Sequence, residues 1–155
     1  MAPKRRKVQK PRKAPGQPPA QQPPSPQPYE VSLSDHASEV YAKLYLAMKE
    51  TDSRGEPNSA HHTTFRMIEE AVKVFIPRNP TDPQYGLRGA LSQYFRVKKE
   101  RHRICWAADS RKRRVCILFI SESLRKEGDR SDPYVVFEKL IKSGAFDKLL
   151  RRLKE

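Results

Sequence analysis

The spacing of apolar residues between positions 94 and 120 limits the fold more than any other feature of this chain. In the run Tyr94-Phe95-Arg96-Val97-Lys98, apolar and cationic residues alternate with the two-residue period of a half-buried β-strand. Residues 101–107 repeat the alternation, and residues 115–120 are apolar at every position, as in a strand covered on both faces. Because a short turn at residues 109–114 joins the last two runs, we expect an antiparallel sheet of three strands, or slightly more.

Helical spacing of apolar residues precedes and follows these strands. One helix is predicted from about Ser34 to Glu50, with Ser34 or Asp35 as its N-terminal cap, and a second covers residues 60–75, where Pro77 and later prolines stop it. C-terminal helices are predicted from Pro133 onward, since proline suits the first turn of a helix. Two N-terminal helices, a sheet and C-terminal helices together predict an α+β domain.

Residues 1–28 differ from the rest of the chain. They hold nine of the 14 prolines and seven basic residues but no acid, and the Pro/Gln-rich run at 17–28 cannot bury a core. We therefore predict a disordered basic arm at 1–28 and a folded domain at 29–155. The run Pro3–Val8 is similar to a nuclear-localisation signal, but we favour an arm that contacts RNA phosphates or adds solubility.

The charge of the chain indicates a polyanionic partner. Lysine and arginine number 32 against 18 acids, for a net charge of +14, and removing the seven charges of the arm leaves +7 on the domain. Nucleic acid is the expected partner of such a protein, and a basic protein that is merely soluble is the alternative. No run approaches the ~18 apolar residues of a membrane span, and no secretory signal is visible, so we predict a cytoplasmic location without membrane contact.

The cysteine and histidine positions argue against bound metal. Cys105 and Cys116 lie in apolar, β-rich runs, which favours two buried thiols in a reducing compartment over a disulfide across a hairpin. His61 and His62 are adjacent rather than spaced for one helix face, so we expect neither a metal site nor another cofactor.

Cations gather on one predicted face of the sheet. The alternation places Arg96, Lys98, Arg101 and Arg103 on the same side of two neighbouring strands, whereas His102 points to the core side. Like charges crowded on one face weaken a sheet, and a bound polyanion would relieve their repulsion. A charged face that is only solvated is the alternative.

The segment after the third strand offers more groups of the same kind. Arg125, Lys126 and Arg130 precede Tyr134, and a loop folded back over the sheet would bring them to the cationic face. The Tyr134 hydroxyl would then move a proton, or its ring would stack on a base. An ordinary tyrosine at a helix start fits the spacing equally well.

The order and spacing of several segments resemble the YhaV-type toxins of the RelE-like superfamily, from about Tyr29 to Asp147. The segments are residues 79–85, with the pattern Asn-Pro-x-x-Pro-x-aromatic; residues 95–98 and 101–106, with the strand cations; residues 124–125 and 130–137, with Leu-Arg and then Ser-Asp-Pro-Tyr-Val-Val-Phe; and the helix end at 139–144.

This resemblance implies a function as well as a RelE-like fold. It implies the toxin of a type II toxin–antitoxin system, a metal-independent endoribonuclease that cuts messenger RNA, often on the ribosome, and inhibits growth. It also implies a cognate antitoxin of the PrlF type. The site residues of the superfamily correspond to Arg96, Lys98, Arg103, Arg125 and Tyr134.

The implied chemistry is attack of the RNA 2′-hydroxyl on the neighbouring phosphate. Arg103 and Arg96 would clamp the phosphate because guanidinium fits it with two hydrogen bonds, and Lys98 would stabilise the added negative charge. Arg125 would aid the leaving oxygen and Tyr134 would carry a proton or stack on a base. The remaining cations, which are Arg101, Lys126 and Arg130, would bind the RNA backbone.

Two other functions remain open from sequence. A non-catalytic RNA-binding protein would use the same basic sheet and arm. A DNA-binding regulator is disfavoured, because the loop at 51–59 is too long for a tight helix-turn-helix.

Overall fold

A four-stranded sheet forms the centre of the protein in a computed structural model that describes residues 27–56, 59–121 and 132–155. The strands are β1 (Glu30–Leu33), β2 (Phe95–Lys99), β3 (His102–Asp109) and β4 (Arg114–Ile120), in the spatial order β1-β4-β3-β2. β2, β3 and β4 form the predicted antiparallel meander. The short strand β1, which the sequence analysis did not predict, pairs in parallel with β4 and forms one edge of the sheet.

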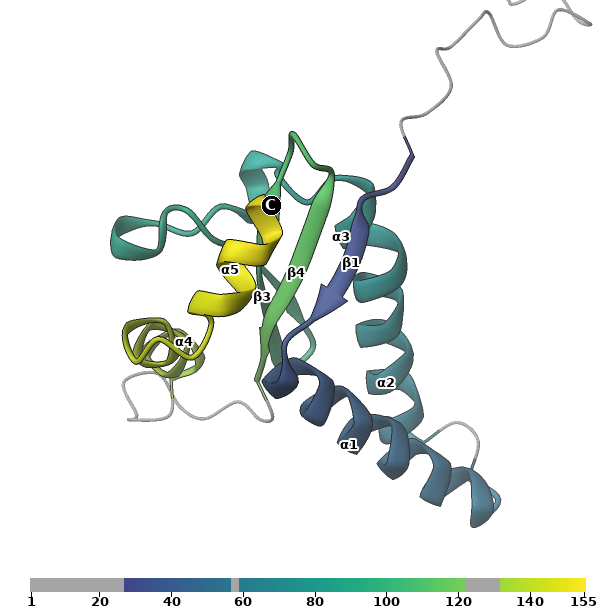
Figure 1. Cartoon of the computed structure of the whole chain (residues 1–155). Coiled ribbons are helices and arrows are strands. Elements are labelled where there is room, and N and C mark those ends of the chain that lie inside the picture. The colour runs from purple at the N-terminus through teal and green to yellow at the C-terminus, as the bar shows by residue number, and fades with distance from the viewer. Residues whose placement is uncertain (1–26, 57–58, 122–131) are drawn as a thin grey trace, which may run out of the picture.

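Helices cover both faces of this sheet (Figure 1). The N-terminal helices α1 (Asp35–Ser53) and α2 (Ala60–Glu70) lie on one face, and the C-terminal helices α4 (Pro133–Lys142) and α5 (Asp147–Lys154) lie on the other. This arrangement confirms the predicted α+β class.

The second helical segment extends further than predicted. After α2 comes a turn of π-helix at Ala71–Phe75, and a last turn, α3 (Ile76–Arg78), passes through Pro77. Proline normally ends a helix because its ring meets the carbonyl four residues earlier. The wider π-turn changes that geometry, since the Ile76 N–H reaches back five residues to the Ala71 carbonyl. Two short 3-10 turns, η2 (Pro83–Tyr85) and η3 (Gly89–Leu91), then lead into β2.

A single serine begins α1 and attaches it to the sheet. Ser34 caps the helix by accepting a hydrogen bond from the Ala37 N–H at 3.0 Å, as one of the two predicted caps. Its hydroxyl also donates to the Leu118 carbonyl at 2.6 Å, in the middle of β4. These two hydrogen bonds fix the start of α1 relative to the central strand.

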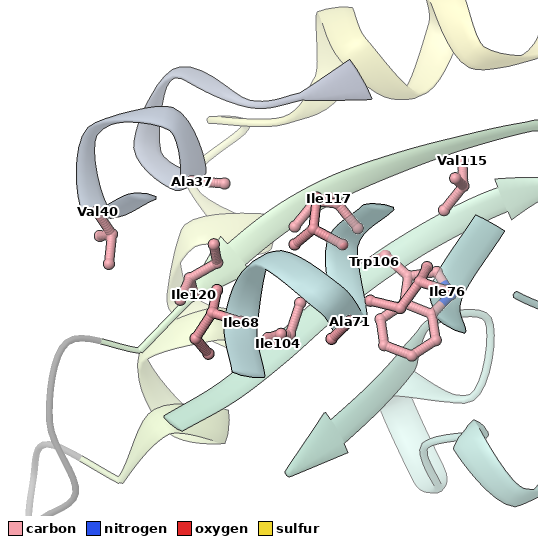
Figure 2. Close-up of a cluster of buried hydrophobic side chains, with 11 residues drawn as sticks. Ala37, Val40, Ile68, Ala71, Ile76, Ile104, Trp106, Val115, Ile117 and Ile120 are labelled. Carbon is pink, nitrogen blue, oxygen red and sulfur yellow. The ribbon is translucent and has the colours of Figure 1, made fainter. Parts of the chain in front are cut away.

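Two apolar cores lie on the two sides of the sheet. On the side of α1 and α2, Trp106 and its neighbours form the cluster drawn in Figure 2. On the side of α4 and α5, Cys105, Leu118 and Phe137 belong to the second cluster. All of residues 115–120 are buried, as predicted for a strand covered on both faces, and a register shift opposite Cys105/Trp106 helps divide them between the two clusters.

Both thiols are buried and free, as expected. In the register of β3 and β4, Cys116 lies opposite Ala107, whereas Cys105 lies opposite Phe119, so the two cysteines are not cross-strand partners.

Some predictions concern residues outside the described ranges. These are the basic arm over residues 1–26 and the loop cations Arg125, Lys126 and Arg130. Within the described ranges, no helix combines the length and apolarity required to cross a bilayer.

Candidate active site

The strand register places three of the predicted cations on one face of the sheet. Arg96 lies opposite Cys105, and Lys98 lies opposite Arg103, in the antiparallel pair of β2 and β3. Directly opposed residues project to the same side, so Arg96, Lys98 and Arg103 share the face that α4 and α5 cover. The alternation that predicted this face is thereby confirmed for these three residues.

The placement of Arg101 on that face was wrong. β3 begins at His102, and Arg101 is an exposed residue of the turn that joins β2 to β3. Glu100, its neighbour in this turn, has φ 55°, and this turn geometry ends the alternation before it reaches Arg101. His102 points to the core side as predicted, where its ring Nδ1 lies 2.5 Å from the Ser121 carbonyl oxygen.

The start of α4 brings Tyr134 to the same place. Asp132 caps this helix by accepting a hydrogen bond from the Tyr134 N–H at 2.9 Å, and Pro133 occupies the first turn. Tyr134 is half-buried against the second core, where Arg96 and Arg103 act electrostatically on its hydroxyl. The helix start therefore sets a phenol beside two guanidinium groups.

Arg103 has an unusual environment for a cation. Its Nη1 atom is buried and has no hydrogen-bond partner among the described residues. Its backbone is firmly held, since its N–H donates to Ser121 Oγ at 2.7 Å and its carbonyl accepts from the Ser121 N–H at 2.9 Å. Burial of an unpaired guanidinium N–H costs free energy, so this group is prepared to accept an anionic partner.

A cavity of about 490 Å³ opens beside Arg96 and Tyr134, and Arg103 is not among its described lining residues. Arg96 and Tyr134 form one wall, and the segment from Pro83 to Arg88 forms the other; the lining residues are Pro83, Gln84, Gly86, Leu87, Arg88, Arg96 and Tyr134. Among the described residues, no acid forms an ion pair with Arg88 or Arg96, the two arginines that line the cavity. The cavity therefore offers positive charge and a phenol hydroxyl to a bound group.

The segment before β2 is fixed against the sheet. The Trp106 indole N–H donates to the Pro80 carbonyl at 2.9 Å, and the Tyr85 ring contacts the same indole edge-on at 5.4 Å between centroids. Gly86 forms a bridge with Phe95, and the Leu87 N–H donates to the Tyr94 carbonyl at 3.1 Å. These contacts make the second wall of the cavity a rigid structure.

Burial and the nearby arginines act in opposite directions on the pKa values of Tyr134 and Cys105. Burial raises the pKa of Tyr134, and Arg96 and Arg103 partly oppose this by favouring the ionised phenol. Burial raises the pKa of the Cys105 thiol to about 12, against the same two guanidinium groups. At neutral pH both groups keep their protons, so Tyr134 is a hydrogen-bond donor and Cys105 is not a thiolate.

Sequence reasoning missed Gln84 and Arg88. The segment 79–85 was noted for its motif, but its pattern did not show that it would line a cavity with Arg96 and Tyr134. Gln84 is oriented by Asp82, whose carboxylate accepts from the Gln84 backbone N–H at 3.0 Å and from its side-chain amide at 3.2 Å. The geometry also places His36, which the sequence analysis passed over, in a stack on Phe119 at 5.1 Å between centroids.

Fold and cavity together define a small, basic α+β protein with an arginine-lined site suited to a phosphate. A family model for toxins with endonuclease activity, of toxin–antitoxin systems, matches residues 31–155. The chain belongs to this family, the YhaV toxins. It is therefore the toxin of a toxin–antitoxin system, has endonuclease activity and has a cognate antitoxin as its partner. A comparison with curated proteins found no match.

Comparison with solved structures found RelE toxins. The toxin–antitoxin complex RelBE2 from Mycobacterium tuberculosis contains a chain with 19% identity and a TM-score of 0.44, matched over 64% of this chain and 100% of that chain. A mutant of E. coli RelE in the free state has 13% identity and a TM-score of 0.46, over 72% and 98%. The isolated E. coli RelE toxin has 15% identity and a TM-score of 0.39, over 74% and 97%.

Proposed function

We propose that this toxin is a metal-independent endoribonuclease that cuts messenger RNA at the cavity between Tyr134 and the segment 83–88. The observation that carries the proposal is the placement of Arg96 and Arg103 on one face of the sheet with the Tyr134 phenol beside them, where Arg96 and Tyr134 line the cavity. RNA supplies its own nucleophile, the 2′-hydroxyl. A site of this composition therefore does not have to activate a water molecule and does not need a metal ion to do so. Such a site acts by orienting the phosphate and stabilising its charge.

The reaction follows from the balance of bonds at phosphorus. The 2′-oxygen gives its proton to solvent water and forms a bond to phosphorus, the bond from phosphorus to the 5′-oxygen breaks, and that oxygen gains a proton from a donor at the site, which solvent then reprotonates. The products are a 2′,3′-cyclic phosphate and a 5′-hydroxyl end. Between these states the phosphate oxygens carry extra negative charge, which Arg103, Arg96 and Lys98 would stabilise from their shared face.

The raised pKa of Tyr134 favours one of its two candidate roles in proton transfer. A phenol that stays protonated at neutral pH cannot accept the proton of the 2′-hydroxyl. It can donate a hydrogen bond or a proton to the leaving 5′-oxygen, with Arg103 and Arg96 stabilising the phenolate formed. We therefore assign Tyr134 as the donor to the leaving group. Arg125, predicted to aid the same oxygen, lies outside the described residues.

The second wall of the cavity supplies further contacts to RNA. Arg88 is exposed and lines the cavity opposite Tyr134, where its guanidinium would bind a neighbouring phosphate. Gln84 holds its amide nitrogen toward Asp82, which leaves its amide oxygen to accept from a base amino group. We assign phosphate binding to Arg88 and base recognition to Gln84.

The partners follow from the same proposal. Messenger RNA is met in the cytoplasm and on the ribosome, where we place the activity. The antitoxin would be of the PrlF type and would cover or reshape this cationic cavity, because the approach of an acidic protein to a basic one is favoured electrostatically.

The test uses a short oligoribonucleotide in the presence of a chelator. The parent protein should cut it and leave a 2′,3′-cyclic phosphate, and Arg103→Ala should lose this activity while Arg66→Ala, an exposed substitution on α2, keeps it. A single 2′-deoxy substitution at the cut site should block cleavage by the parent. Intact RNA under all these conditions, with binding that weakens as salt rises, would instead support a non-catalytic RNA-binding role.

A further inference from the structure

Three segments of the chain converge at the end of the sheet farthest from Arg103 (Figure 1). They are the turn between β3 and β4, the C-terminal end of α5 and the residues that lead into β1. We call this the basic end. Its cations in the described ranges are Arg111, Lys112, Arg113, Arg114, Arg151, Arg152 and Lys154.

Hydrogen bonds hold the three segments together. The Arg114 guanidinium donates to the carbonyls of Arg152 and Glu155, at 3.4 and 3.3 Å, and so joins β4 to the end of α5. Arg113 donates to the Gln27 carbonyl and lies over the Tyr29 ring at 4.6 Å, which joins the turn to the chain before β1. The basic end is therefore one continuous surface.

The cations of the basic end are not paired with acidic side chains of the described residues, whereas several cations elsewhere in the protein are. Lysines on other helical segments pair with glutamates four residues away, as in Lys73 with Glu69 at 3.3 Å and Lys142 with Glu138 at 3.0 Å. None of these seven cations forms an ion pair with a described residue.

Asp109, the last residue of β3, borders the turn of the basic end but leaves its cations available. Its carboxylate accepts the backbone N–H groups of Arg111 and Lys112, at 2.9 and 3.0 Å. The charged groups of Arg111 and Lys154 act on this carboxylate electrostatically, without the close contact of an ion pair. The carboxylate thus stabilises the turn, and the exposed cations around it remain able to bind an external anion.

The basic arm begins at this same surface. Residues 1–28 carry seven cations and no acid, and Gln27, near their C-terminal limit, is bound to Arg113. Like charges brought to one place repel each other unless a polyanion neutralises them. The cations of the basic end are therefore expected to favour a bound polyanion.

The surface lacks the apolar groups typical of protein-binding sites. The exposed large apolar side chains of the described residues are Tyr45, Leu46, Val74, Phe75 and Val135, and none belongs to the turn or to α5. Protein interfaces are usually anchored by aromatic or aliphatic residues at their centre. Arginines and lysines without such anchors fit the phosphates of nucleic acid better than an acidic protein.

We propose that the basic end binds the phosphate backbone of RNA away from the cut site and so anchors long RNA on the toxin. This inference rests on the proposed ribonuclease function. Along β3 the basic end is about 20 Å from Arg103, given the rise of a strand. A stacked RNA strand covers that distance in about six nucleotides, so an oligonucleotide of about four nucleotides fills the cavity without reaching the basic end.

The experiment compares these two lengths of substrate. In the full chain, Arg111→Glu, Arg151→Glu and Lys154→Glu reverse three exposed charges of the basic end. The matched control reverses Lys43, Lys49 and Arg66, which are exposed on α1 and α2. The triple variant should raise KM for a long transcript at least about tenfold and lower the slope of log affinity against log salt by about 2 to 3. It should leave the cleavage of the short oligonucleotide and the Tm unchanged. The control variant should cleave both the long transcript and the short oligonucleotide like the parent.

The outcomes separate this inference from the ribonuclease proposal. If the parent cuts neither substrate, the ribonuclease proposal fails. If the parent cuts both and the triple variant cuts both equally well, the anchoring role is overturned while the ribonuclease role stands. If the variant keeps its RNA affinity but no longer binds its antitoxin, the surface binds protein instead, and the inference is again overturned.

Discussion

At the scale of single residues, the most informative group is the Arg103 guanidinium. Its Nη1 atom is buried and has no hydrogen-bond partner among the described residues, and in a protein of marginal stability such a group persists where function requires it. Arg103 also shares its sheet face with Arg96 and Lys98, so charge repulsion adds to the cost of that burial. An apolar substitution of Arg103 should therefore lower the catalytic rate without lowering the free energy of unfolding.

Arg103→Met tests this opposition. We expect kcat to fall by about a factor of 100 or more, because removing one preorganised donor to a transition-state oxygen typically has that effect. The free energy of unfolding should stay equal or rise by about 1 kcal/mol, because an apolar side chain replaces a cation in a partly buried position. Arg103→Lys should not restore kcat, since ammonium cannot form the two-pronged contact. Cleavage of a short RNA and thermal unfolding are the two measurements, and marked destabilisation would mean that Arg103 has a structural role instead.

Tyr134→Phe removes only a hydroxyl. The phenol is expected to donate to the leaving oxygen, so kcat should fall by about 10²-fold or more, the usual contribution of a positioned acid, with KM little changed. Because burial raises the pKa of Tyr134 above its ordinary value, the phenol stays protonated throughout neutral and mildly alkaline pH. The cleavage rate of the parent should consequently not fall through ionisation of Tyr134 as pH rises toward 10. A fall caused by this ionisation is expected only above pH 10. A titration of tyrosinate absorbance, parent minus variant, checks the pKa directly; a transition below pH 10 would contradict the assignment.

At the scale of elements, the segment from Pro80 to Arg88 links the core to the cavity. Its attachment depends on Trp106, which is fully buried and donates to the Pro80 carbonyl. Because Tyr85 contacts the same indole, a change in the core is transmitted to the wall that carries Gln84 and Arg88.

Trp106→Phe should reveal this link. The substitution removes the indole N–H and leaves a buried carbonyl without its donor, so the free energy of unfolding should fall by about 1 to 3 kcal/mol. RNA cleavage should show a raised KM at temperatures where the variant remains folded, because the second wall loses its fixed position. Ile104→Val, a core substitution on the same strand and face, serves as control and should lower stability by about 1 kcal/mol with KM unchanged. Equal KM in both variants would show that the wall does not depend on Trp106.

The same elements show which parts of the structure the sequence could predict. Strands β2 and β3 and the face shared by Arg96 and Arg103 followed from alternation, a local signal that burial enforces, and β4 followed from its continuous apolar run. Strand β1 was missed because four residues give too short a pattern and its parallel partner lies more than eighty positions away. Tyr134 was a candidate from its place after the third strand and from the family resemblance, but no periodicity shows that a helix start will lie beside two strands. Arg88 had no signal at all, because cavity walls depend on how distant segments pack.

At the scale of the whole molecule, charge is distributed between the folded body and the arm. Of the net charge of +14, seven positive charges belong to residues 1–28, and the remaining +7 belongs to the rest of the chain. The first described contact of the body with the N-terminal chain is at Gln27, and the first paired strand starts at Glu30. The arm should therefore contribute to affinity for RNA but not to the stability of the fold.

Replacing the seven basic residues of the arm by glutamine tests this division while keeping its length. Because of counterion release, the salt slope should fall by about 0.7 to 0.9 for every phosphate that the arm no longer neutralises, so an arm that uses several of its cations should change that slope by several units. The affinity for a long transcript should fall accordingly, whereas kcat on a short oligonucleotide and the Tm should match the parent, because the cavity and both cores lie within the described body. A scrambled arm of the same composition is the control, and it should bind like the parent, since phosphate attraction depends on charge rather than order. If the glutamine arm binds RNA as tightly as the parent over the whole salt range, the arm has no part in RNA binding and the charge of the folded body alone accounts for the affinity.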